Sequence, residues 1–148
     1  MNCDEAAEKV IDILNTDFAI LRIVKGYQLK YFFYGKDGRL KEKVEMSAET
    51  LPELFKKIIN KEAVFCAPAE ALIEKFYELL AGRCVSFELR VWDGNLGPKE
   101  KGWSVWLVSP DGELRYNEMA RGKEFTAAIT AALEMFEKAL AFQQWLSD

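Results

Sequence analysis

The side chains that could carry out chemistry in this 148-residue chain are carboxylates, lysines, tyrosines and three cysteines, because the chain contains no histidine. The absence of histidine excludes Ser/His/Asp and Cys/His nucleophilic schemes and His-ligated metal sites. Cys3, Cys66 and Cys84 form no CxxC pair that would hold zinc. An enzyme would need a carboxylate site or a thiolate at Cys66 or Cys84. We expect no enzymatic activity, no cofactor, and reduced thiols with Cys66 and Cys84 buried.

The segment WDGNLGPKEKGW is the most unusual in the chain, because it places ten residues between Trp92 and Trp103. Long loops on rigid hairpins often carry binding residues, and tryptophan is favoured at interface hot spots. The predicted partner-binding residues are Trp92, Asp93, Asn95, Leu96, Lys99, Glu100 and Trp103. The alternative is that both tryptophans are core residues at strand ends and that the loop is a neutral insertion.

Three residues of this loop, Asp93, Asn95 and Glu100, could also be considered as calcium ligands. Their spacing lacks the later ligands and the terminal glutamate of a calcium loop. The Asp-Gly pairs at Asp37 and Asp111 are typical of tight turns, in which glycine adopts positive φ freely. The sequence therefore predicts turns at these positions and no metal site.

A basic and aromatic face in the first half is the second candidate site. Its predicted nucleotide-binding residues are Lys30, Tyr34, Arg39, Lys41 and Lys43. Aromatic rings interleaved with cations can stack on bases and neutralise phosphate. Nearby glutamates dilute the patch and no Gly-rich phosphate loop is present, so a solvated strand with structural aromatics is the alternative. A protein partner therefore ranks ahead of a nucleic acid or a small nucleotide.

The formal net charge of −4 is divided unevenly along the chain. Residues 1–61 carry 11 basic and 10 acidic side chains, and residues 62–148 carry 9 and 14. The acids expected on the exterior of the second half are Glu88, Asp93, Glu100, Asp111, Glu113 and Glu118. They would complement a basic partner surface, with ordinary solubilising charge as the alternative.

Hydrophobic periodicity predicts the elements that must position these residues. In the first half we expect a helix over 4–14, strands over 18–24, 27–34 and 39–46, and a helix that begins near Thr50. In the second half we expect a helix from 68, strands over 84–92, 103–109 and 113–120, and a helix over 124–146. Several strands are apolar on both faces, so helices on both sides, or a partner chain, would be needed to cover them.

The stretches GKDGRL and SPDGEL indicate an internal duplication. Asp37 and Asp111 are 74 positions apart (111 − 37), and the same offset superposes apolar residues of the following strand and helix. The alternative is that any ββα unit uses an Asp-Gly turn and an apolar stripe. We predict an α+β protein of two tandem α-β-β-β-α units, residues 1–62 and 63–148, each a three-stranded antiparallel meander covered by helices.

Four stretches of the second half carry a resemblance to a known family: PAEALIEKFYEL, SFELRV, GWSVWL and FTAAITAALEM. In the order of their elements and in the residues of these stretches, residues 68–138 resemble small phage α-β-α sandwich domains, which place one helix before and one after a three-strand meander. The resemblance implies a viral or prophage accessory protein and supplies no catalytic residues. The element order is also similar to double-stranded-RNA-binding domains, but Lys123 alone stands where that family has a lysine cluster.

These observations together predict a phage-type accessory protein, without enzymatic activity, that binds and inhibits a host-defence or toxin protein. A nucleotide or nucleic-acid binding module is the alternative, and a homodimer is compatible with either. No run approaches the roughly 18 apolar residues of a membrane span, and the N-terminus is acidic where a secretory signal is basic. We therefore expect a cytoplasmic protein, in the host cytoplasm if it is phage-encoded.

Overall fold

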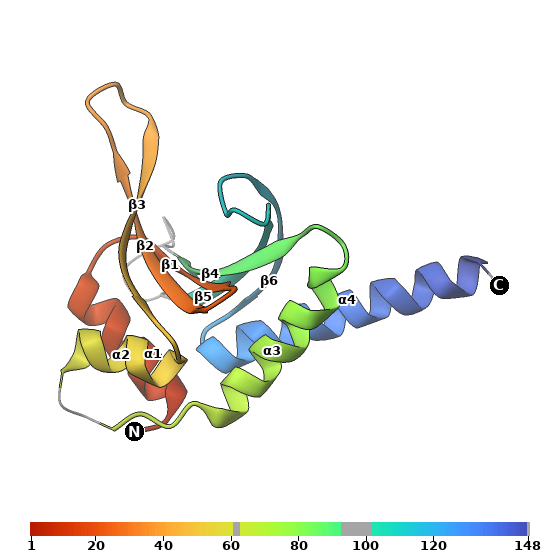
Figure 1. Ribbon diagram of the computed structural model, residues 1–148, viewed down its shortest axis with the longest axis horizontal. Helices are drawn as coiled ribbons and strands as arrows, with labels where there is room; N and C mark the ends of the chain where they lie inside the picture. Colours follow the sequence, from red (N-terminus) through yellow and green to blue (C-terminus); the bar gives the residue numbers. More distant parts are fainter. Residues whose placement is uncertain (61–62, 93–101, 148) are drawn as a thin grey trace.

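The computed structural model describes residues 1–60, 63–92 and 102–147. The described chain forms α1 (Cys3–Leu14), β1 (Phe18–Ile23), β2 (Gly26–Tyr34), β3 (Leu40–Ala48), α2 (Leu51–Ile59), α3 (Ala67–Ala81), β4 (Ser86–Trp92), β5 (Gly102–Val108), β6 (Arg115–Gly122) and α4 (Phe125–Ser147). The strands make one antiparallel sheet in the order β3-β2-β1-β4-β5-β6. Figure 1 shows the helices gathered below this sheet. The predicted α+β class is confirmed.

Side chains just before α1 and α2 cap the first turns of these helices. The Asn2 side chain accepts a hydrogen bond from the Glu5 N–H at 2.9 Å, which caps α1. The Thr50 side chain accepts from the Glu53 N–H at 3.3 Å, and Pro52 occupies the first turn of α2. Because these caps satisfy backbone donors that the helix leaves unpaired, both helices begin where the sequence predicts.

The two Asp-Gly stretches are hairpin turns, as predicted. Asp37 Oδ1 accepts from the Arg39 N–H at 3.1 Å, and Asp111 Oδ1 accepts from the Glu113 N–H at 3.0 Å. The glycine that follows each aspartate has positive φ, near +76° and +77°. Aspartate stabilises a turn when its side chain accepts a hydrogen bond from a nearby backbone N–H. The turns therefore account for both aspartates, and no bound ligand is needed to explain them.

The two halves of the chain meet at the centre of the sheet, where β1 pairs antiparallel with β4. Two more strands of each half follow on either side of this pair, so the third, second and first strands of each half run from one edge of the sheet to its centre. The predicted boundary at residues 62 and 63 therefore falls between two segments that share one sheet.

One face of the sheet and the helices enclose the main core. Alternate strand residues such as Ile20, Leu29 and Leu89 point into it and are at most 2% exposed. Four rings contact one another edge to face through this core: Phe18 with Trp103, Trp103 with Phe125, and Phe125 with Phe55. Of the two predicted ways to cover both faces, helices on both sides is not found among the described residues, where the opposite face carries the small cluster of Ala19, Leu21 and Phe32. Cover by a partner chain stays a prediction.

The cysteines differ in exposure. Cys3 and Cys66 are buried, as predicted for Cys66, but Cys84 is exposed. The prediction for Cys84 is wrong because it lies in the α3–β4 turn, with a φ of 55°, rather than in the strand. A side-chain hydrogen bond with Cys66, together with burial, raises the pKa of the Cys3 thiol far above its usual range.

We expect one fast-reacting thiol in the native protein, because thiolates react and only Cys84 is accessible. With an aromatic disulfide reagent at pH 8, Cys84 should react at least 100-fold faster than the other two, which should react only on unfolding. A Cys84→Ser variant should lose the fast phase. Two or three equally fast thiols in the native protein would contradict this placement.

Candidate functional site

The predicted partner-binding loop lies mostly outside the described residues, which is where Asp93, Asn95, Leu96, Lys99 and Glu100 fall. Trp92 ends β4. Trp103 begins β5 on the helix-covered face, is 1% exposed and packs against Phe18 and Phe125. Trp103 is therefore a core residue at a strand end, and its role in binding a partner stays a prediction.

The five predicted nucleotide-binding residues do not share one surface. Lys30 and Tyr34 point to the open face of the sheet, and Lys30 is only 4% exposed. Lys41 and Lys43 pair with Phe33 and Tyr31 on alternate positions and point the other way. Arg39 lies in the β2–β3 turn. The projecting β2–β3 hairpin (Figure 1) therefore splits the expected basic face between its two sides.

The open face of the sheet is bent into a trough. Five strand spacings of about 4.8 Å would separate the edge strands of a flat sheet by roughly 24 Å. Yet Arg115 of β6 lies 2.6 Å from Glu42 of β3. Irregular pairing between Leu29 and Lys30, and at two places in β5, adds to the bend. The sheet therefore curves until its first and last strands are joined by an ion pair.

Four charges cross this trough and form what we call the trough cluster: Lys30, Glu42, Glu88 and Arg115. The Lys30 ammonium lies 2.9 Å from Glu42 and 3.3 Å from Glu88, and donates to the Gly112 carbonyl at 3.0 Å. Arg115 also pairs with Glu88. Two positive and two negative charges leave the cluster neutral, which is how buried charges are tolerated.

Glu88 is fully buried, so its prediction as an exterior acid is wrong. Strand alternation puts it in the trough, where Lys30 and Arg115 neutralise it. Its Oε2 has no aligned hydrogen bond despite the ammonium at 3.3 Å. Phe32 lies beside the cluster, with the Arg90 and Arg115 guanidinium groups 4.4 and 4.3 Å from its ring centre. With every charge of the cluster paired, we assign the trough a structural role.

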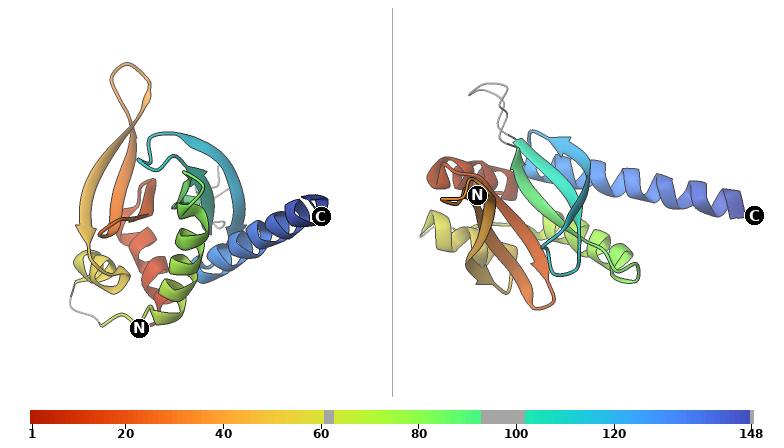
Figure 2. Two further views of the ribbon diagram at one scale, coloured as in Figure 1. Left: turned by 45° about the vertical axis from the view of Figure 1, so that its right-hand side comes forward. Right: turned by 90° about the horizontal axis from the view of Figure 1, so that it is seen from above.

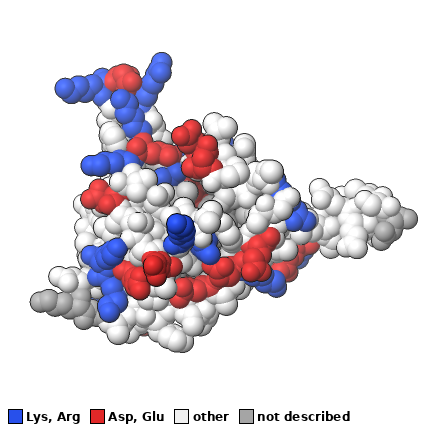
Figure 3. Space-filling model, in the orientation of Figure 1, with Lys and Arg blue, Asp and Glu red and all other residues white. Residues whose placement is uncertain are grey.

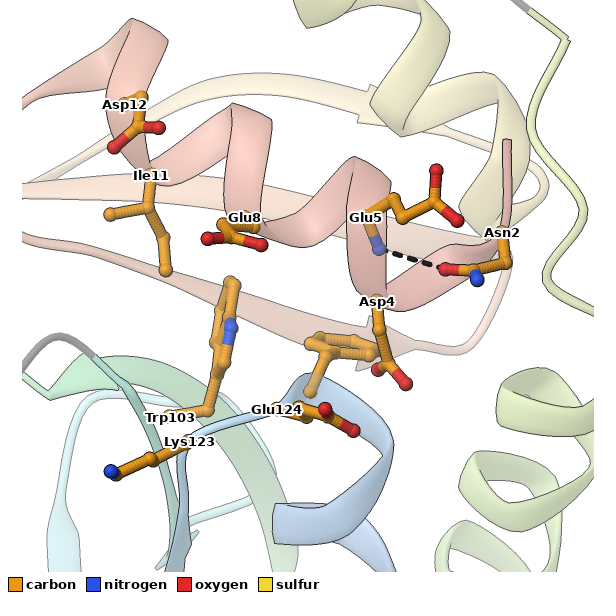
Figure 4. A pocket seen from close by; sticks show the side chains of 10 residues that line it. Asn2, Asp4, Glu5, Glu8, Ile11, Asp12, Trp103, Lys123 and Glu124 are labelled. Carbon is orange, nitrogen blue, oxygen red and sulfur yellow. Dashed lines mark hydrogen bonds between the residues drawn. The ribbon is translucent and has the colours of Figure 1, made fainter.

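A pocket of about 500 Å³ lies on the other side of the sheet, between α1 and the start of α4. Figure 4 shows Glu8 above the Trp103 indole ring, with Lys123 and Glu124 across from α1. The residues that line it are Asn2, Asp4, Glu5, Glu8, Ile11, Asp12, Trp103, Lys123, Glu124 and Phe125. We call it the acidic pocket, because it holds five carboxylates and one lysine.

Helical spacing explains the acidic wall. Asp4, Glu8 and Asp12 are four residues apart in α1, so they lie along one side of the helix. Asp4 is already engaged, since its Oδ1 accepts from the N–H and the hydroxyl of Thr126 at 2.8 Å each and so caps α4. Among the described residues, the carboxylates of Glu5, Glu8 and Glu124 have no ion-pair partner.

The base of the pocket is aromatic and includes an indole donor that has no acceptor among the described residues. Trp103 and Phe125 contact each other with ring centres 4.9 Å apart. The Trp106 indole donates to Ser104 at 3.1 Å, whereas no hydrogen bond is found for the Trp103 indole among the described residues. The only fully buried polar side-chain atoms without a bond there are Tyr27 Oη and Glu88 Oε2. Trp103 lines the pocket, so its small exposed fraction lies there.

This arrangement suits an organic cation that also carries a hydrogen-bond acceptor. The carboxylates attract positive charge, aromatic faces favour cations, and the indole N–H needs an oxygen to accept from it. Among the described residues no three acidic or sulfur side chains are placed to share a metal ion. A peptide lysine or arginine with a neighbouring carbonyl meets all three requirements.

Part of this pocket is visible in the sequence. The acids of the first helix are spaced on one side, and Trp103 was among the predicted binding residues. The sequence does not show that Glu124 lies near Glu8, because the two are 116 positions apart (124 − 8) and only the folded chain brings them to one pocket.

Comparisons with known proteins add nothing to this geometry: no protein-family model, curated protein or solved structure matches the chain. None of the described helices has the length and apolar character needed to cross a bilayer.

Proposed function

We propose that the protein is a binding protein, without catalytic activity, that captures a basic segment of a partner protein in the acidic pocket. The observation that carries this proposal is the excess of four negative charges, five carboxylates less Lys123, around the Trp103 indole N–H, for which the described residues supply no hydrogen-bond acceptor. A basic peptide supplies cations for the wall and carbonyl oxygens for the indole.

Charge supports a protein partner over a nucleic acid at this site. Phosphate groups would meet Glu5, Glu8 and Glu124 and be repelled, whereas a basic surface would be attracted at long range. The phage-type inhibitor of a host-defence or toxin protein, expected from the family resemblance, is a particular form of this proposal. Proteins that act on nucleic acids present basic surfaces of the required kind. The loop residues between Trp92 and Trp103 stay a proposed extension of the binding surface.

Peptide binding tests the proposal directly. A fluorescein-labelled octapeptide of alternating Arg and Gly should bind, with fluorescence anisotropy as the measurement, and the matching Glu and Gly peptide should not. The triple variant Glu5→Gln, Glu8→Gln, Glu124→Gln should bind at least tenfold more weakly, because each lost exposed pair costs up to about 1 kcal/mol. Affinity should also fall as salt is raised.

A matched variant separates the pocket from overall charge. Glu78, Glu113 and Glu134 are exposed and lie outside the pocket, so changing all three to Gln removes the same charge elsewhere. This control should bind within about twofold of the wild type. Equal loss in both triple variants would mean that net charge, and not the pocket, attracts the peptide, and the proposal would fail.

We also propose that the two halves derive from a duplication. Supporting it, the turns around Asp37 and Asp111 repeat their hydrogen bonds at the 74-position offset. The Gly38 N–H donates to Gly35 at 3.0 Å and the Gly112 N–H donates to Ser109 at 2.8 Å. The strand order, symmetric about the β1–β4 pair, is the order expected if each half contributes an equivalent meander.

A further inference from the structure

The last helix carries two apolar stripes, and the fold uses only one. The first consists of the buried residues Phe125, Ala128, Ile129, Ala132 and Leu133. At about 100° per residue, its continuation reaches Leu140, Gln143 and Ser147, of which Gln143 and Ser147 are polar and exposed. The core stripe of α4 therefore loses its apolar character in the last two turns.

The second stripe consists of Met135, Ala139, Phe142 and Leu146. These residues lie within about 60° of arc, and the centre of this arc is roughly a quarter turn from the centre of the core stripe, so the two stripes overlap at their edges. Met135, Phe142 and Leu146 are 53%, 59% and 62% exposed. Trp145 flanks them at 71% exposed and stacks on Phe142, with ring centres 6.0 Å apart. We call these five residues the arm stripe.

The end of α4 that carries the arm stripe leaves the body of the protein. Both views of Figure 2 show it projecting beyond the sheet and the other helices. Its surface is white in Figure 3, because no charged residue occurs from Ala139 to Ser147. An uncharged apolar arm offers nothing to a phosphate backbone or to the basic segment proposed for the acidic pocket. It does not repel a second arm.

Spacing and area point to a second copy of this chain. The steps of four, three and four residues from Met135 to Leu146 are those of a coiled-coil seam, and Ala139 permits close approach of two helices. Since an aromatic side chain buries about 150–250 Å², the arm stripe offers about 500 Å² of exposed apolar surface per copy. Two copies would bury about 1,000 Å² from these side chains alone, near the lower bound for a specific interface.

We propose that α4 mediates homodimerisation, with the arm stripes of two copies packed against each other across a twofold axis. Sedimentation velocity from about 1 to 200 μM should show a concentration-dependent monomer–dimer equilibrium. The variant Phe142→Glu, Leu146→Glu should weaken the dimer at least 100-fold, since it places charges in the apolar seam. Both residues are exposed, so far-UV circular dichroism and the unfolding midpoint of the variant should stay close to those of the wild type.

The control Gln144→Glu, Ser147→Glu adds the same charge to the same turns outside the arm stripe and should leave dimerisation within about threefold. A wild-type chain that stays monomeric throughout the concentration range would overturn the proposal. So would a dimer that survives the variant with charges in the seam, or one that the control disrupts equally.

Discussion

Glu88→Gln should destabilise the protein by about 3–5 kcal/mol, since it leaves two cations with one carboxylate in the trough. Glu88 is fully buried and contacts both Lys30 and Arg115. Glutamine has nearly the same volume as glutamate but no charge, so packing changes little. Lys30, which is 4% exposed, then keeps Glu42 as its one carboxylate partner. Urea unfolding followed by tryptophan fluorescence would measure the loss.

Two further variants make this prediction specific to charge. Glu113→Gln, on an exposed turn residue with no ion-pair partner among the described side chains, should stay within about 0.5 kcal/mol of the wild type. Lys30→Met combined with Glu88→Gln should be more stable than the sum of the two single changes, because the pair Arg115 and Glu42 remains balanced. Strictly additive costs would show that the trough cluster is not coupled.

Phe125→Ala should cost about 3–5 kcal/mol in the free energy of unfolding. Phe125 is fully buried at the start of α4 and contacts Trp103 and Phe55 edge to face, with ring centres 4.9 and 5.8 Å away. Removing it opens a cavity and breaks the chain of rings that joins β5 to α2. The measurement is again the urea midpoint, with the slope checked for a change in the surface exposed on unfolding.

Phe65→Ala is the matched change for this second prediction, since Phe65 is 65% exposed. It should cost less than about 1 kcal/mol, because most of its ring stays in water in both states. If Phe125→Ala costs no more than Phe65→Ala, the ring chain described for the core is not a feature of the folded protein.

The local elements could be predicted from sequence because their signals are local. Caps at Asn2 and Thr50 and turns at Asp37 and Asp111 depend on hydrogen bonds that span two or three residues. The strands were predicted from runs of apolar residues, and each predicted strand is present with its ends shifted by at most a few residues. The class α+β needed no more than this order of elements.

The sites could not be predicted as well, since they depend on the curvature and pairing of the sheet. Lys30 and Arg115 look like surface cations in the sequence, and only the bend of the sheet places both against Glu88. Alternation within β3 sends Lys41 and Lys43 to the face opposite Lys30. Glu124 joins the acids of α1 through the path of β5 and β6, which no spacing in the sequence encodes.

The pairing of β1 with β4 affects how the chain is made. β4 begins at Ser86, about 60 residues after β1 ends, and ribosomes add about 5–20 residues per second. For several seconds the emerging chain therefore presents one side of β1, from Ala19 to Leu21, as an unpaired apolar edge. Such edges recruit strands from other chains. While this edge of β1 waits for β4, the nascent chain is open to aggregation there, and we expect chaperones that act on the ribosome to improve the yield of folded protein.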